Sequence, residues 1–195
     1  RATRELVSSP QRLHAAILGG FLPDEADRDR VLWRLDAPER HRLDLYVLSA
    51  VEPSFEGVAD QAGWPGRPTW RTASYRPLLE RLEGGQRWIF RLRANPVRHV
   101  RAEGQSRGKR VAIPRTPDQL AWLLRQGNKH GFRVQDGGAG TPNVRISEQR
   151  TDRFSRDDGE RRRQVTLATV AFDGVLEVSD PGALREALTS GIGPA

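Results

Sequence analysis

Helical and strand-like patterns follow one another in the same order twice along this chain, which limits the folds that it can adopt. In the first half, a segment with helical spacing precedes two alternating strand patterns, a short helical segment and a third strand pattern ending at Ala94. From Asn95 onward, the second half repeats this theme. Elements in this order pack as an α+β protein, in which helices cover one face of a sheet.

One further strand would give each half the order strand–helix–strand–strand–helix–strand, which is the ferredoxin-like arrangement. The sequence therefore predicts two tandem ferredoxin-like domains, the first in residues 1–94 and the second in residues 95–195. An ordinary two-layer α+β domain built from the same elements is the alternative.

Local signals mark where the elements of the first half begin and end. Ser9-Pro10 and Gly19-Gly20 bound the first helix, with the serine oxygen as its cap. Residues 31–35 and 43–49 read as the two strands of a hairpin. Residues 52–71 are rich in Gly, Pro and Trp, so we expect a long loop there.

Similar signals occur in the second half. Thr116 is the expected cap of a helix that ends at Gly127, and Asp180-Pro181 starts the last helix. Asp173-Gly174 is the typical sequence of a type I′ turn, so we expect a hairpin with its turn at these two residues.

Arginine dominates the charge of the chain. Lysine and arginine together number 32 against 25 acidic residues, the formal net charge is +7, and Lys109 and Lys129 are the only lysines. A guanidinium group can bind phosphate through two hydrogen bonds and can stack on bases, so this composition favours a nucleic-acid partner. A general preference for arginine codons is the alternative explanation.

The composition excludes several classes of protein. The chain has no cysteine, which excludes disulfides, thiolate zinc sites and cysteine nucleophiles. No apolar run is long enough to span a bilayer and no segment resembles a signal peptide, so we expect a cytoplasmic protein without membrane contact. The sequence contains neither a phosphate-binding loop nor a Gly-x-Ser-x-Gly nucleophile motif.

His14 is the residue best placed for acid–base chemistry. It follows Leu13 at the edge of the apolar face of the first helix, where an imidazole can contact both the protein and a ligand. The other histidines, His41, His99 and His130, are far apart in sequence and have no metal-binding spacing. A single histidine at such a position is more often a hydrogen-bonded surface residue without catalytic function.

Cleavage of RNA is one reaction that needs little more than histidine and arginine. The 2′-hydroxyl of RNA is its own nucleophile, so an acid, a base and cations near the phosphate suffice without a metal or other cofactor. The element best suited to bind a nucleic acid is an arginine-rich hairpin, which can lie along a groove of the duplex and bind its phosphates. Its arginines are Arg150, Arg153, Arg156, Arg161, Arg162 and Arg163. An exposed, merely solvated charged hairpin is the alternative.

Three stretches share motifs with a known family. They are Pro10-x-x-Leu13-His14, the run Phe90-Arg91-Leu92-Arg93-Ala94-Asn95-Pro96 with the downstream Gly108-Lys109-Arg110-Val111, and the tail from Phe172 to Gly193. In this order, and over essentially the whole chain, they resemble the CasE family, the CRISPR repeat-processing endoribonucleases of the type I-E system. The second motif is the most specific of the three.

The resemblance implies two ferredoxin-like domains and metal-independent cleavage of precursor CRISPR RNA beside the repeat stem-loop, leaving a cyclic phosphate. It also implies that the processed RNA stays bound and that the protein assembles with other Cascade subunits, without a small-molecule substrate. Family members have an additional strand before the segment matching residue 1 and a glycine-rich loop and strand after the one matching Gly193. The terminal strand that each half lacks in the ferredoxin-like order therefore corresponds to one of these family elements.

The resemblance also assigns residues to roles. The catalytic histidine of the family falls on His14, and the hairpin that enters the RNA groove falls on roughly residues 150–163. Some members have a tyrosine three residues before the histidine, where this chain has Gln11, so Gln11 is the second catalytic candidate. The RNA-binding candidates are Arg91, Arg93, Lys109, Arg110, Arg150, Arg153, Arg156, Arg161, Arg162 and Arg163.

Two other functions are compatible with the sequence. An RNA-binding or assembly subunit that has lost cleavage activity would keep the same fold, and Gln11 in place of the tyrosine favours this alternative. A basic scaffold for other proteins would bind RNA weakly, with no preference for a stem-loop and with little salt dependence.

Overall fold

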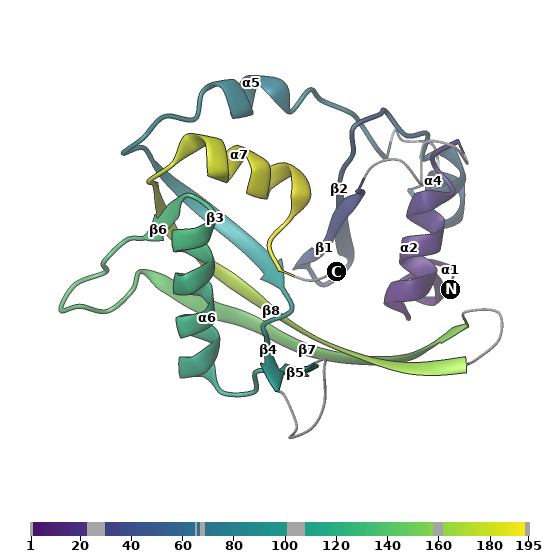
Figure 1. Cartoon of the computed structure of the whole chain (residues 1–195). Helices are drawn as coiled ribbons and strands as arrows, with labels where there is room; N and C mark the ends of the chain where they lie inside the picture. Colours follow the sequence, from purple (N-terminus) through teal and green to yellow (C-terminus); the bar gives the residue numbers. More distant parts are fainter. Residues whose placement is uncertain are drawn as a thin grey trace. The chain divides into compact units, whose positions relative to one another are not determined.

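The computed structural model describes residues 2–22, 30–64, 66, 69–100, 108–157 and 162–193 (Figure 1). Helices and strands mix in two compact units, residues 1–76 with 152–166 and residues 77–151 with 167–195. Each unit has its own hydrophobic core. Within the described ranges, no helix is long and apolar enough to cross a membrane.

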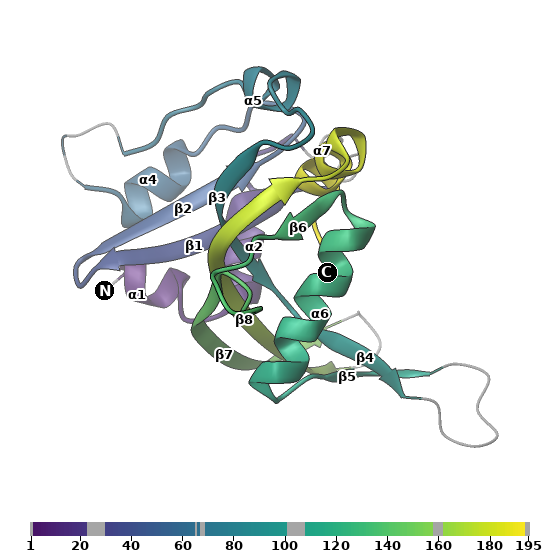
Figure 2. The ribbon, with the colours of Figure 1, turned by 90° about the vertical axis from the view of Figure 1, so that its left-hand side faces the viewer.

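A helix and a two-stranded hairpin form the core of the first unit. Helix α2 (Pro10–Leu18) buries Leu13 and Ile17 almost completely, and burial of each side chain stabilises the unit by about 1.5–3 kcal/mol. Strands β1 (Leu32–Glu39) and β2 (Arg42–Leu48) are antiparallel and run side by side in Figure 2. The expected first helix and hairpin are therefore confirmed.

Alternation along the hairpin explains which of its side chains reach α2. Trp33 lies opposite Val47 and Leu35 lies opposite Leu45 in the register, so these four residues share one face. All four pack against the cluster that contains the buried residues of α2. The hairpin therefore provides the surface on which α2 packs.

The other helices of this part of the chain are short. Helix α1 (Ala2–Leu6) precedes α2 and was not expected from the sequence. Helix α4 (Glu56–Ala62) lies where a long loop was expected, and α5 (Arg76–Glu80) follows it. The ring of Trp70 packs edge-on against Phe55, with centroids 6.0 Å apart, so this tryptophan contacts its own unit.

Two helices and a four-stranded sheet form the second unit. The strands are β3 (Arg87–Ala94), β6 (Phe132–Val134), β7 (Val144–Asp157) and β8 (Arg162–Val178). Their order is β3–β8–β6, and β7 also pairs with β8. Strand β3 pairs with β8 in an antiparallel register that runs from Arg87 opposite Glu177 to Ala94 opposite Val170. Residues 87–94, expected in the first domain, thus belong to the second unit.

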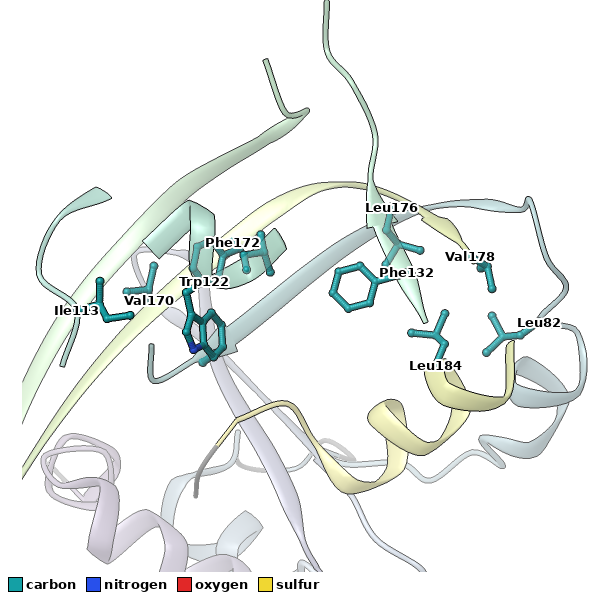
Figure 3. Close-up of a cluster of buried hydrophobic side chains, with 11 residues drawn as sticks. Leu82, Ile113, Trp122, Phe132, Val170, Phe172, Leu176, Val178 and Leu184 are labelled. Carbon is teal, nitrogen blue, oxygen red and sulfur yellow. The ribbon is translucent and has the colours of Figure 1, made fainter. Parts of the chain in front are cut away.

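The core of this unit lies between the sheet and its helices. Trp122 on α6 (Thr116–Lys129) stacks on Phe172 of β8 with ring centroids 6.3 Å apart. In Figure 3, Leu184 of α7 (Pro181–Ser190) lies between Phe132 and Leu82. Aromatic residues contribute the largest buried areas of such a core.

The second unit also contains a separate hairpin. Strands β4 (Val97–Val100) and β5 (Lys109–Ala112) are antiparallel, with His99 opposite Arg110. The sequence predicted a short basic strand or loop near β5 but gave no sign of β4. Four residues are too few to show a clear period.

The ends of helices α6 and α7 test the expected caps. The Asp180 carboxylate accepts hydrogen bonds from the backbone N–H groups of Gly182 and Ala183, which confirms the predicted cap of α7. Helix α6 is capped at Arg115 rather than Thr116 and continues past Gly127 to Lys129. A Cβ at Gly127 would lie 2.7 Å from the carbonyl oxygen of Phe132, so this glycine permits close packing.

The expected turn at Asp173-Gly174 is wrong, because β8 continues through both residues. Asp173 instead accepts a hydrogen bond from Arg91 on the neighbouring strand. Gly174 allows the chain at Asn143 to come close: a Cβ there would lie 2.4 Å from the Asn143 carbonyl oxygen, which accepts a hydrogen bond from Val175 N–H. Contacts with residues far away in sequence, rather than a turn, thus explain the aspartate and the glycine at these two positions.

Replacing Gly174 with alanine should lower the free energy of unfolding by about 2 kcal/mol, because the new methyl group collides with backbone that cannot move aside. Gly57→Ala is the matched control, since no atom lies within 4 Å of its added Cβ on α4. That variant should be as stable as the wild type or slightly more stable. Urea unfolding of both variants measures the difference, and equal stabilities would contradict this account.

Candidate functional site

His14 projects from α2 while its neighbours hold the helix in place. Leu13 and Ile17 face the core, and His14 is exposed. Ser9 begins the helix in an extended conformation, and its carbonyl oxygen accepts from the Leu13 N–H; its side chain makes no capping hydrogen bond. The expected serine side-chain cap is therefore wrong, although the helix starts where predicted.

The imidazole of His14 has a specific hydrogen-bond partner. The Trp33 indole N–H on β1 donates to Nδ1 of His14 at 3.3 Å. Nineteen residues separate the two in sequence, and the indole reaches α2 because Trp33 lies on the core-facing side of its strand. The sequence did not identify Trp33 as a site residue. The only signal for it was the alternation of apolar residues along its strand, which indicates the core-facing side but not a contact with His14.

Gln11 lies on the same helix, three residues before His14, so the two side chains project from the same side. It is exposed. An amide can donate and accept hydrogen bonds but cannot exchange a proton near neutral pH. Of these two side chains, only the imidazole can therefore exchange a proton near neutral pH.

Arg91 and Arg93 on β3 are ion-paired within the second unit. Arg91 Nε lies 2.5 Å from Asp173 Oδ1, and Arg93 makes two hydrogen bonds to the Glu148 carboxylate. The hydrogen bond from Arg91 holds the pKa of Asp173 below its ordinary value of 3.8, and Ser147 and Arg145 act in the same direction. A bound phosphate would therefore compete with these carboxylates.

Lys109 and Arg110 are exposed on β5, and within the described ranges neither forms an ion pair. Arg98 and His99 lie exposed on the partner strand β4. The sequence missed these two because it gave no sign of β4. The hairpin therefore carries basic side chains on both of its strands.

The arginine-rich hairpin is formed by the ends of β7 and β8, which pair with each other. Arg150 and Arg153 are exposed on β7, and Arg153 forms no ion pair with any residue that the structure describes. The backbones of Arg156, Arg162 and Arg163 lie in these strands, whereas Arg161 lies outside the described residues.

The candidate residues divide between the two compact units. His14, Gln11 and the hairpin from residue 152 to residue 166 belong to the first unit. The second unit holds Arg91, Arg93, Lys109, Arg110 and Arg150. The residues for acid–base chemistry thus share a unit with part of the arginine-rich hairpin.

The other histidines have different surroundings. His130 follows the last turn of α6, where burial, and then the charge of Lys129, lower its pKa. His41 is exposed between β1 and β2. Among the residues that the structure describes, no three histidine or acidic side chains are grouped so that they could hold a metal ion.

Comparison with known proteins adds independent evidence. Residues 1–195 match a family model described as "CRISPR associated protein". The CRISPR-associated endoribonuclease Cse3 of Thermus thermophilus is 33% identical over 199 residues, which cover 100% of this chain and 88% of that protein. The Cascade subunit CasE of Escherichia coli is 35% identical over 122 residues, 58% of this chain and 55% of that protein.

A solved structure is similar over the same range. It is Thermus thermophilus Cse3 bound to an RNA that represents a pre-cleavage complex, with a TM-score of 0.76 and 31% sequence identity. The match covers 100% of this chain and 87% of that one. Sequence and fold are therefore similar over the whole chain.

Arg91→Gln should lower the free energy of unfolding at pH 7 by about 0.5–1.5 kcal/mol, because it removes a partly exposed hydrogen-bonded pair. The lowered pKa of Asp173 means that this stabilisation is present above pH 3.8 and is lost as the pH falls through the folded-state value. Urea unfolding of Arg91→Gln and the wild type at pH 7 and below pH 3.8 measures this change in stability.

Arg87→Gln is the control for this experiment, since its pair with Glu177 is longer, at 3.5 Å, and more exposed. It should change stability less than Arg91→Gln at pH 7. A difference between Arg91→Gln and the wild type that is as large in acid as at pH 7 would contradict the role given to Asp173.

Proposed function

The chain belongs to the family of CRISPR-associated proteins, and we propose that it is an endoribonuclease that cleaves precursor CRISPR RNA at the repeat stem-loop. The observation that carries this proposal is the match over the whole chain to the endoribonuclease Cse3, in sequence and in fold. The exposed His14 on α2 supplies a group capable of the chemistry.

The proposed reaction uses the nucleophile of the RNA itself. The 2′-hydroxyl attacks the adjacent phosphorus, the bond to the 5′-oxygen of the next nucleotide breaks, and a cyclic phosphate remains. His14 exchanges a proton with a reacting oxygen, which is worth about 10²–10⁴ in rate. Gln11, one turn away, orients the RNA by hydrogen bonding, and arginines stabilise the charge that develops on the phosphate. No metal takes part in this mechanism.

The RNA-binding residues differ in what binding requires of them. Lys109, Arg110 and Arg153 can meet a phosphate without first giving up an ion pair with a described residue. Arg91 and Arg93 must release Asp173 and Glu148, or share their donors with them. We therefore assign the larger contribution to the first group. The hairpin of β7 and β8 holds the stem of the RNA.

Two tandem ferredoxin-like domains are the proposed architecture. The second unit supports this, because β3, α6, β6, β8 and α7 follow the order strand–helix–strand–strand–helix once the β4–β5 hairpin and β7 are set aside as insertions, and β8 lies between β3 and β6. In this proposal β3 opens the second domain, so the boundary lies before Arg87 rather than after Ala94. In the first domain α2, β1, β2 and α4 follow the same order.

We propose that the protein remains bound to its product and joins other Cascade subunits, since its Escherichia coli relative is named as a subunit of that complex. The second candidate function is an RNA-binding assembly subunit without cleavage activity. The observation that favours it is Gln11, which stands where some family members have a tyrosine.

His14→Ala should reduce cleavage of the cognate repeat RNA at least 100-fold while the affinity for that RNA changes less than about threefold, because the exposed imidazole supports chemistry more than binding. Single-turnover cleavage in the presence of a chelator measures the first quantity, and filter binding measures the second. His41→Ala, at an exposed turn, is the matched control and should cleave at the wild-type rate.

Each result of the His14 experiment has a definite reading. Unchanged cleavage by His14→Ala would contradict the proposed mechanism. Tight, stem-loop-specific binding without cleavage by the wild type would establish the assembly-subunit alternative. Cleavage that the chelator abolishes would show that a metal is required.

Replacing both Lys109 and Arg110 with alanine should weaken RNA binding and reduce the slope of log K against log salt by about 2, because each phosphate contact contributes about one unit. Replacing both Arg125 and Lys129, which are exposed on α6, with alanine is the control for loss of two positive charges alone. Titration of the stem-loop RNA at several salt concentrations gives the slopes. An equal change in both variants would show only a general charge effect.

A further inference from the structure

The hydrogen bond between Trp33 and His14 determines which nitrogen of the imidazole carries a proton. An indole N–H can only donate, so Nδ1 of His14, 3.3 Å away, must present its lone pair. A neutral imidazole has one protonated nitrogen. With Nδ1 as the acceptor, the proton is on Nε2.

The other protonation states conflict with this contact. In the second neutral tautomer the proton is on Nδ1, and in the imidazolium both nitrogens are protonated. Either state would bring two N–H groups face to face at 3.3 Å. Trp33 therefore opposes both, as long as its ring keeps this position.

Packing holds the indole in this position. Trp33 is half-buried and contacts the cluster around Leu13 and Ile17, the residues that fix α2 to the hairpin. Its backbone pairs with Val47 of β2. The donor therefore belongs to the rigid part of the first unit, while His14 projects from the helix beside it.

Charged groups on the same elements are engaged with one another. Arg12 of α2 pairs with Glu5 of α1 at 3.4 Å. Arg34 of β1 pairs with Asp36 at 3.1 Å and lies over the ring of Tyr46 on β2, on the face of the hairpin opposite to Trp33. The neutral indole of Trp33 contacts the imidazole directly, 3.3 Å from Nδ1.

We propose that Trp33 is a positioning residue for His14, which it holds neutral with the proton on Nε2. In this state Nε2 donates a hydrogen bond to the RNA and cannot accept the proton of the 2′-hydroxyl. Before Nε2 can accept a proton, the contact with Trp33 must open, Nδ1 must take up a proton from solvent, and Nε2 must release its own proton to solvent. The inference deepens the proposed function and rests on it for the role of His14.

The first test observes the tautomer directly. In the full chain labelled with ¹⁵N-histidine, the nitrogen shifts and the two-bond ¹H–¹⁵N correlations distinguish a protonated from an unprotonated Nδ1. His14→Ala identifies the signals of His14. We expect an unprotonated Nδ1 in the wild type and, in Trp33→Phe, a measurable shift toward the other tautomer. Identical His14 nitrogen shifts in the two proteins would overturn the proposal.

A second variant separates loss of the donor from loss of packing. A tryptophan analogue whose indole N–H is replaced by sulfur keeps the size of the ring at residue 33. It should shift the His14 nitrogens as Trp33→Phe does, with a stability close to that of the wild type. Trp70→Phe, whose ring packs on Phe55, is the matched control and should leave the His14 signals unchanged.

Cleavage connects the tautomer to the reaction. Both Trp33 variants should change the single-turnover cleavage rate of the repeat RNA at least threefold, with the affinity for RNA unchanged. Wild-type rates in both variants would overturn the positioning role. If His14→Ala cleaves normally, the proposed function fails, and the nitrogen shifts still decide whether Trp33 sets the tautomer.

Discussion

The second unit depends on the uninterrupted course of β8. This strand pairs with β3 on one side and with β6 and β7 on the other, and it contributes Phe172 and Val178, both almost fully buried, to the core. A turn at Asp173-Gly174 would end the pairing with β3 midway and would separate Arg91 from its carboxylate partner. Asn143 approaches β8 at Gly174, and any residue with a Cβ there would collide with it. A glycine therefore lets the strand continue past this close contact.

The first unit holds one polar side chain, His14, at the surface beside its hydrophobic core. Burial of Leu13 and Ile17 against the hairpin fixes the rotation of α2 about its axis, and this rotation places His14 at the edge of the buried face. The same hairpin face provides the indole that contacts the imidazole. The packing of the core and the hydrogen bond to His14 are therefore coupled through Trp33, which contributes its ring to the first and its N–H to the second.

Local sequence signals predicted the elements whose causes are local. Pro10 at the start of α2, Asp180 at the start of α7 and the alternation of the first hairpin acted as expected, because helix starts and strand faces depend on nearby residues. The predictions failed where a distant segment approaches. Gly174 and Gly127 carry turn and stop signals, but each is a glycine because backbone from another element lies against it. The position of His14 at the edge of the buried helix face was predicted from its spacing, whereas its contact with Trp33 could not be, since that contact needs the packed hairpin.

Composition alone cannot separate arginines that hold the protein together from arginines that can meet a polyanion. Arg91, Arg93 and Arg87 lie on the outward face of β3, and each pairs with a carboxylate on β7 or β8. Alternation correctly predicted that this face is exposed, but the carboxylates come from residues 55 or more positions away. A phosphate that replaces one of these carboxylates gains one ion pair at the expense of another, so the net gain in binding free energy is small.

The basic side chains of β4 and β5 have no such carboxylate among the described residues, and a phosphate bound there adds an interaction without breaking one. Of these two groups of basic side chains, the one on β4 and β5 is therefore better placed to bind a phosphate.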